Sequence, residues 1–158
     1  MEEYNNNNLF FNDLIHLDHA FKNSDEFFDF IFPILYANGY VKQSFLAAIK
    51  AREAAYPTAL PTQPYVVALP HTDIEHINKP FISVTRVKGN VAWHEMANND
   101  CILQANFIFL LGFTEKDGHI NLLQTLMACF TEGDFLQQLY ECQTTEGFIH
   151  LLYSKVKF

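Results

Sequence analysis

Residues 103–111 read LQANFIFLL, and this stretch decides the class of fold. Between Ala105 and Leu111 only Asn106 is polar. Such a continuous apolar run is typical of a strand that is buried on both faces of a sheet. We therefore predict a central strand here, and we expect the other strands at residues 14–18, 65–69, 81–87 and 91–95.

The segments around these strands carry helical signals. Ser24 is predicted to cap a first helix that stops at Asn38–Gly39, with Pro33 indicating a kink or a misplaced boundary. A second helix is predicted from about Lys42 to Glu53, with Phe45, Leu46 and Ile49 on its buried side. Three prolines make residues 56–64 a loop, and further helices are expected at 119–130, 135–139 and 145–152. This order favours a single layered α/β domain with a mixed sheet over residues 1–158, preceded by a mobile leader at residues 1–8.

Composition limits the classes of function. The formal net charge of -8 argues against nucleic acid as the main partner. No apolar stretch reaches the ~18–20 residues that span a bilayer, so we expect no membrane insertion. The acidic start Met1–Tyr4 differs from a signal peptide, which predicts a cytoplasmic protein. Cys101, Cys129 and Cys142 lack metal-site spacing and are predicted to be reduced thiols.

The main chemical candidate is His71, in the stretch VALPHTD at residues 67–73. A strand stops at Pro70, and the next residue is an imidazole, which near pH 7 is neutral, nucleophilic and able to share a proton. One interpretation is a histidine that becomes phosphorylated. Position alone leaves open the alternative of an ordinary loop histidine.

Four further residues could support such a site. His119 follows the turn Asp117–Gly118 at a helix start, where backbone N–H groups favour a phosphoryl group. Arg52, near the end of the second helix, offers a planar cation that binds phosphoryl oxygens bidentately. Thr58 and Thr72 offer hydroxyl donors and are weaker signals. The alternatives are a surface residue for His119 and a helix-end charge for Arg52.

The sequence argues against other chemistries. His71, Glu75 and His76 are spaced as H-x-x-x-E-H, and histidines five apart do not share one helix face, so we expect no metal. No nucleotide-binding glycine loop and no nucleophile elbow occurs, so we expect no cofactor. Phosphoryl transfer from a protein donor needs none of these motifs, because the donor brings the group already activated.

These residues resemble the enzyme IIA components of the bacterial sugar phosphotransferase system, in the fructose–mannitol superfamily. The matching segments are RE at 52–53, YPTAL at 56–60, VALPHTD at 67–73, EHI at 75–77 with KP at 79–80, and GHI at 118–120. The combination is most similar to the galactitol branch. The resemblance implies a three-layer α/β/α sandwich with a mixed central sheet.

The resemblance also implies a function. It implies a phosphotransferase component whose His71 accepts a phosphoryl group on the ε2 nitrogen from phospho-HPr. The group then passes to a cysteine of enzyme IIB, which serves the membrane enzyme IIC. His119 and Arg52 match the phosphoryl stabilisers of the superfamily. An alternative is a regulatory protein in which phosphorylation of the same histidine controls binding to other proteins.

Overall fold

A computed structural model describes the backbone of residues 9–116 and 118–156, and the side chains of residues 9–116 and 121–156. The expected leader at residues 1–8 therefore lies outside the described residues. In chain order the elements are η1 (Asn12–Leu14), β1 (Ile15–His19), α1 (Ser24–Ala37), α2 (Phe45–Ala55), β2 (Ala59–Leu60), β3 (Val67–Ala68), η2 (Ile74–His76), β4 (Phe81–Glu95), β5 (Asn98–Gly112), α3 (Gly118–Thr131), α4 (Phe135–Glu141) and α5 (Thr145–Lys155).

The sheet is mixed, as predicted. Strands β4 and β5 form a long antiparallel hairpin, and β1 runs parallel to β4 on its other side. Strand β3 runs parallel to β5, and β2 pairs antiparallel with β3. At the far end of β4, Glu95 pairs with Ala59 of β2. The predicted central strand is confirmed, because β5 has a hydrogen-bonded neighbour on each side.

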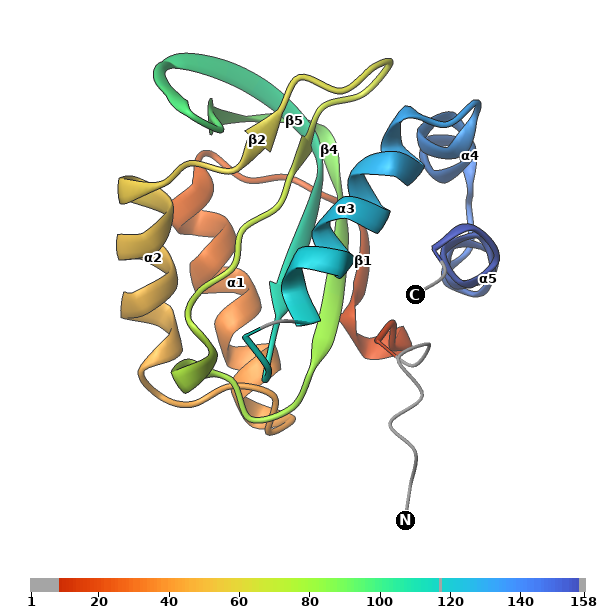
Figure 1. The fold of residues 1–158 in the computed structure, drawn as a ribbon. Coiled ribbons are helices and arrows are strands. Elements are labelled where there is room, and N and C mark those ends of the chain that lie inside the picture. The colour runs from red at the N-terminus through yellow and green to blue at the C-terminus, as the bar shows by residue number, and fades with distance from the viewer. Residues whose placement is uncertain (1–8, 117, 157–158) are drawn as a thin grey trace.

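Two hydrophobic cores lie on opposite faces of the sheet, which confirms the three-layer sandwich. Phe107, Phe109 and Leu111 pack in one core with residues of α3, α4 and α5. Ile108 and Leu110 pack in the other core with residues of α1 and α2. Successive strand residues point to opposite faces, so a strand covered on both sides must be apolar throughout. Figure 1 shows α1 and α2 on one side of the sheet and α3 to α5 on the other.

The boundaries of the first two helices differ from the prediction. Asn23, not Ser24, caps α1, and its side chain accepts a hydrogen bond from the Glu26 backbone N–H. The helix continues through Pro33, which is exposed, so water can reach the backbone carbonyl that lost its partner. Helix α2 begins at Phe45, three residues after Lys42.

The bounds of three predicted strands also differ in the structure. Only Val67 and Ala68 of the 65–69 segment join the ladder, because the Val66 N–H donates to the Asn106 side chain and Pro70 has no N–H. The predicted strands 81–87 and 91–95 form one continuous strand, β4. Gly89, with a φ of 77°, allows the irregular register between them.

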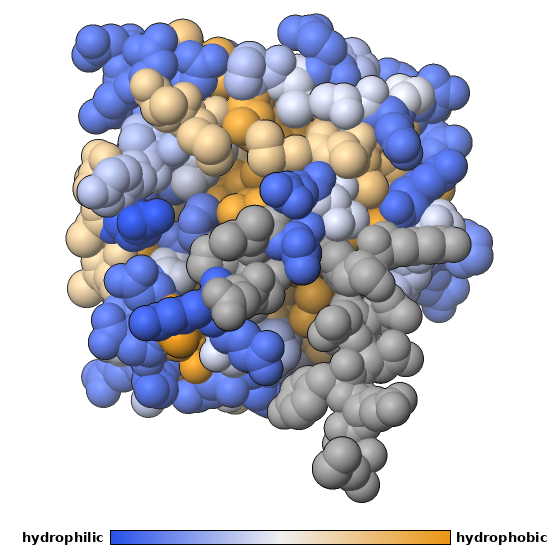
Figure 2. Space-filling view, in the orientation of Figure 1, coloured by the Kyte–Doolittle hydropathy of each residue, from blue (hydrophilic) through white to orange (hydrophobic). Residues whose placement is uncertain are grey.

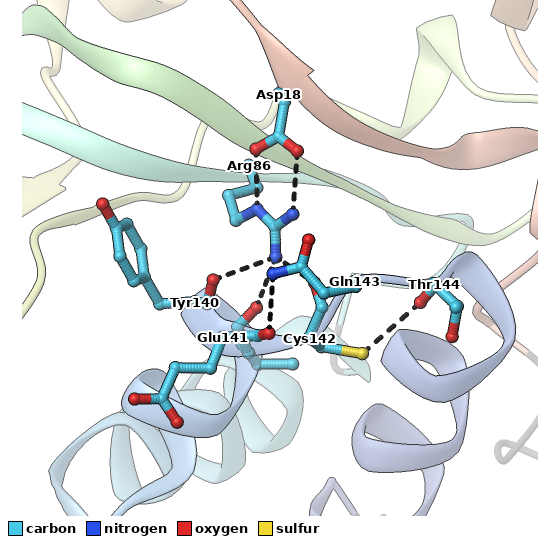
Figure 3. A network of polar contacts seen from close by, with 8 residues as sticks. Asp18, Arg86, Tyr140, Glu141, Cys142, Gln143 and Thr144 are labelled. Carbon is cyan, nitrogen blue, oxygen red and sulfur yellow. Dashed lines mark hydrogen bonds and ion pairs between the residues drawn. The ribbon is translucent and has the colours of Figure 1, made fainter.

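A buried arginine joins three elements that are far apart in the sequence (Figure 3). Arg86 of β4 donates through Nε and Nη2 to both carboxylate oxygens of Asp18 in β1, each at 3.0 Å. Its Nη1 donates to the carbonyls of Leu139, Tyr140 and Cys142, at 2.9, 3.1 and 2.5 Å, where α4 ends. The guanidinium thus satisfies helix-end carbonyls that have no intrahelical partner.

The helices are short relative to a bilayer. Among the residues that the structure describes, no helix has both the length and the hydropathy needed to cross a membrane.

Candidate phosphohistidine site

His71 lies where β3 leaves the sheet. It forms an isolated parallel bridge with Leu111 at the end of β5, and the Leu111 N–H donates to the Pro70 carbonyl at 3.0 Å. The imidazole is partly exposed and meets the Phe113 ring edge-on, with 6.0 Å between the ring centroids. The backbone of His71 is therefore fixed by the sheet, while its ring lies at the surface.

The tautomer of His71 follows from one hydrogen bond. Its Nδ1 atom is 2.8 Å from the Leu69 carbonyl oxygen. A carbonyl oxygen only accepts, so Nδ1 carries the proton. In the neutral ring the lone pair is then on Nε2, which makes Nε2 the nucleophilic atom.

The segment around Thr58, which faces Leu69, is held in place by a buried carboxyl group. Glu53, only 7% exposed, accepts from the Thr58 N–H at 2.9 Å and from the Thr58 hydroxyl at 2.9 and 3.1 Å. The Trp93 indole N–H of β4 donates to the same carboxyl at 2.5 Å. The Thr58 carbonyl in turn accepts from the Leu69 N–H at 3.2 Å.

Burial dominates the electrostatics of this carboxyl. Desolvation raises the pKa of Glu53 to about 7, although hydrogen bonds from Thr58 and Trp93 and the charge of Arg52 act in the opposite direction. A glutamate with this pKa is present in both protonation states near neutral pH.

The sequence assigned Glu53 no role, but a signal was present. Phe45 and Ile49 form the buried side of α2, and Glu53 follows Ile49 by four residues. That spacing places Glu53 on the same apolar face. A carboxyl on the buried side of a helix indicates a specific hydrogen-bonding role.

The predicted supporting residues lie in different surroundings. Arg52 is half-buried, and its guanidinium carbon lies 4.5 Å from the centre of the exposed Tyr56 ring, a cation–π contact. Thr58 is buried and bonded to Glu53, and Thr72 is buried directly after His71. His119 belongs to the first turn of α3, and its side chain lies outside the described residues.

The residues that follow His71 form a short helix that contacts the start of α2. Ile74–His76 form a short 3-10 helix, and the His76 Nδ1 lies 2.8 Å from the Ser44 hydroxyl. His76 thus connects η2 to the start of α2. Among the described side chains, no group of three or more His, Cys, Asp or Glu is arranged to hold a metal ion.

The surface at the end of α2 carries an exposed aromatic group, because Tyr56 is 62% exposed. A hollow between the end of α2 and the β4–β5 turn is lined by Ala55, Tyr56, Pro57, Met96, Ala97, Asn98 and Asn99. Figure 2 shows apolar patches in the upper middle of the face shown, bordered by hydrophilic residues.

A partly exposed histidine at the end of a strand, in the tautomer that makes Nε2 the nucleophile, defines a candidate for histidine phosphotransfer. The family comparison agrees with this class. Residues 8–155 match the family model described as phosphoenolpyruvate-dependent sugar phosphotransferase system, EIIA 2, and the chain belongs to this family.

Curated relatives are distant. The chain is 28% identical over 113 residues to the fructose-specific EIIABC component of Mycoplasma pneumoniae, a match that covers 70% of this chain and 15% of that protein. It is 24% identical over 110 residues to the galactitol-specific EIIA component of Escherichia coli K12, covering 70% of this chain and 73% of the relative. The chain thus spans a small part of the first relative and most of the second.

Solved structures share the fold. The Escherichia coli complex of mannitol enzyme IIA with phosphorylated mannitol enzyme IIB has a TM-score of 0.74 at 19% identity, covering 92% of this chain and 99% of the other. The nitrogen regulatory protein IIA-Ntr of Neisseria meningitidis has a TM-score of 0.76 at 18% identity, covering 92% and 97%. At these identities the likeness shows the fold.

Proposed function

We propose that this chain is a phosphocarrier of the sugar phosphotransferase system, and that His71 Nε2 is its phosphoryl acceptor. The observation that carries the proposal is the hydrogen bond from the His71 Nδ1–H to the Leu69 carbonyl, because it leaves the lone pair of the neutral ring on Nε2. Family membership over residues 8–155 supports the same function.

The reaction needs no cofactor. The phosphorus–nitrogen bond of phospho-HPr breaks as a new bond forms between phosphorus and His71 Nε2, while Nδ1 keeps its proton. The group then moves to a cysteine thiolate of an enzyme IIB, which restores the neutral imidazole. The Escherichia coli complex of mannitol IIA with phosphorylated IIB supports this choice of acceptor.

The phosphoryl group needs stabilising donors. We assign that role to Arg52, whose guanidinium leaves the Tyr56 ring and forms charge-assisted hydrogen bonds with the phosphoryl oxygens. His119 and Thr72 are the further donors, and Thr58 acts through its hydrogen bonds to Glu53. The exposed Tyr56 provides part of an apolar rim for transient docking of HPr and enzyme IIB.

The physiological assignment is a cytoplasmic component of carbohydrate uptake, of the galactitol type, acting on the membrane enzyme IIC only through enzyme IIB. The galactitol-specific relative supports the branch. The fold likeness to IIA-Ntr favours a second candidate, a regulatory protein controlled by phosphorylation of His71. Enzyme IIB proteins discriminate the two, because only the phosphocarrier passes the group on.

The test is phosphorylation in a reconstituted relay. The protein is incubated with phosphoenolpyruvate, enzyme I and HPr, and acid-labile phosphate on the chain is measured. We expect label on the wild type, none on His71→Ala, and wild-type label on His150→Ala, which removes an exposed histidine of α5. Equal label on His71→Ala, or none on the wild type, contradicts the proposal.

A second step distinguishes the two candidate functions. Added galactitol-type enzyme IIB should remove the label, and retention of the label with every enzyme IIB tried favours the regulatory candidate.

A further inference from the structure

Packing alone does not explain why a carboxyl group occupies the buried position of Glu53. It occupies the apolar side of α2, where Phe45 and Ile49 are the neighbouring buried residues. An apolar side chain of similar size would fill this position without the desolvation that a carboxyl suffers. Instead, the carboxyl contacts Thr58 through the backbone and the hydroxyl, and Trp93 through the indole. Glu53 therefore ties the segment after α2 to strand β4.

From this carboxyl a continuous path of hydrogen bonds reaches the His71 ring. Glu53 binds the Thr58 N–H at 2.9 Å, and the Thr58 carbonyl accepts from the Leu69 N–H at 3.2 Å. The Leu69 carbonyl accepts from His71 Nδ1 at 2.8 Å. Each link holds one peptide group of a residue whose other peptide group, across the Cα atom, makes the next link, so the position of the Leu69 carbonyl depends on Thr58, and Thr58 depends on Glu53.

We propose that Glu53 is a positioning residue for phosphoryl transfer, which sets the Leu69 carbonyl and thereby holds His71 as the Nδ1–H tautomer with Nε2 as nucleophile. The inference rests on the proposed function of His71. Glu53 touches neither the nucleophile nor the phosphoryl group, and it acts through Thr58 and Leu69. It differs in this from its neighbour Arg52, which lies on the outer side of the same helix end against Tyr56.

The network is satisfied whichever protonation state Glu53 adopts. As a carboxylate, it accepts from the Thr58 N–H, the Thr58 hydroxyl and the Trp93 N–H. As a neutral acid, it donates its proton from Oε2 to the Thr58 hydroxyl oxygen, 2.9 Å away, and Oε1 still accepts from both N–H groups. Glutamine preserves the Oε1 acceptor and has an N–H donor in place of the acid proton, so it mimics the neutral form.

The experiment compares Glu53→Leu and Glu53→Gln with the wild type. The control is Phe148→Leu in α5, a core change in the cluster that also holds the Leu69 side chain, which lowers stability and leaves every hydrogen-bonding group of the path in place. Two experiments are made: single turnovers give the saturating rate constant and the half-saturating concentration of phospho-HPr, and the ring nitrogen NMR shifts of the unphosphorylated protein give the tautomer of His71.

We expect Glu53→Leu to lower the saturating rate constant roughly ten- to a hundredfold, because misplacing a catalytic group acts on this step. The half-saturating concentration should stay within about twofold, since the docking surface is intact. The His71 ring should become a mixture of tautomers. Glu53→Gln should restore most of the rate and the Nδ1–H tautomer, and Phe148→Leu should change neither quantity.

A wild-type rate and a pure Nδ1–H tautomer in Glu53→Leu overturn the inference. If Glu53→Leu does not fold, Glu53→Met replaces it, because its flexible side chain fills the site without an oxygen acceptor for the Thr58 N–H; an unchanged rate and tautomer there overturn the inference equally. A wild-type protein that takes no phosphoryl group on His71 overturns the proposed function itself. The tautomer measurement separates the two failures, because it needs no phosphorylation.

Discussion

Glu53 also makes the stability of the protein depend on pH. Its pKa is raised from 4.5 to about 7, chiefly by desolvation. Because the folded-state pKa exceeds the unfolded value, the folded protein binds more protons than the unfolded chain between these two pH values. The contribution of this group to the free energy of unfolding is therefore most favourable below pH 4.5 and declines as pH rises toward about 7.

Substituting the carboxyl by an amide should remove this dependence. As pH rises from 4.5 to 7, the free energy of unfolding of Glu53→Gln should increase by about 3 kcal/mol relative to that of the wild type, since one pKa unit corresponds to about 1.4 kcal/mol. Urea unfolding at several pH values measures the difference. Glu132→Gln, at an exposed position, is the matched control and should follow the wild type. A constant difference between Glu53→Gln and wild type over this range would show that Glu53 does not titrate there.

At the scale of single residues, the sequence predicted the nucleophilic histidine but not the hydrogen bonds of Glu53 that lead to it. Pro70 and the preceding apolar strand indicated where His71 lies, because both signals are local. The partners of Glu53 are Thr58, five residues away, and Trp93, forty residues away. Only the packing of α2 against the sheet brings Trp93 to this carboxyl.

At the scale of elements, Arg86 is the connection that sequence patterns did not predict. Its guanidinium joins β1, β4 and the end of α4 (Figure 3). The hydrogen bonds from Arg86 are the largest cause that lowers the pKa of the exposed Asp18 carboxyl. Because that pKa is depressed, the stability that the pair contributes is present at neutral pH and is lost as pH falls below the ordinary aspartate range, near 3.8.

Arg86→Met should destabilise the fold. The substitution leaves the carbonyls of Leu139, Tyr140 and Cys142 without their common donor, and each buried unsatisfied group costs roughly 1–3 kcal/mol. We expect a loss of about 3 kcal/mol in the free energy of unfolding by urea, and faster amide hydrogen exchange in α4 than in β5. Arg86→Lys should recover less than half of this loss, because an ammonium cannot bind Asp18 bidentately. Full recovery with lysine would contradict the role of the guanidinium geometry.

The boundaries of elements show the same division between local and distant causes. The end of α1 at Asn38–Gly39 follows from local residue preferences and was predicted. The shortness of β3 was not, because it depends on the Asn106 side chain taking the Val66 N–H. The joining of two predicted strands into β4 depends on the partner strand β5 continuing alongside.

At the scale of the whole molecule, two cores share one strand. Trp93, the single tryptophan, lies in the core with α1 and α2, where it contacts Phe27 and Phe28. Phe130 of α3 lies in the other core, in edge-on contact with Phe109 of β5. Because β5 contributes alternate residues to both cores, loss of one core should weaken the other.

Phe130→Ala therefore tests the cooperativity of the fold. We expect it to lower the free energy of unfolding by about 3–5 kcal/mol, the range for buried phenylalanines. The urea midpoints from Trp93 fluorescence and from far-UV circular dichroism should shift together. Phe28→Ala, in the other core, should produce the same coincidence. A fluorescence midpoint that stays at the wild-type value while the dichroism midpoint falls would show that the two cores unfold independently.

The sequence by itself determined the layered α/β class, the central strand at 103–111 and the location of His71, because apolar periodicity and proline act on neighbouring residues. Only the tertiary structure decided which strands pair, that Glu53 reaches Thr58 and Trp93, and that Arg86 closes α4 against β1. Those contacts depend on the register of the sheet and on which helix covers which face. Register and coverage follow from the packing of two cores around a shared strand, a property of the whole chain that no short segment encodes.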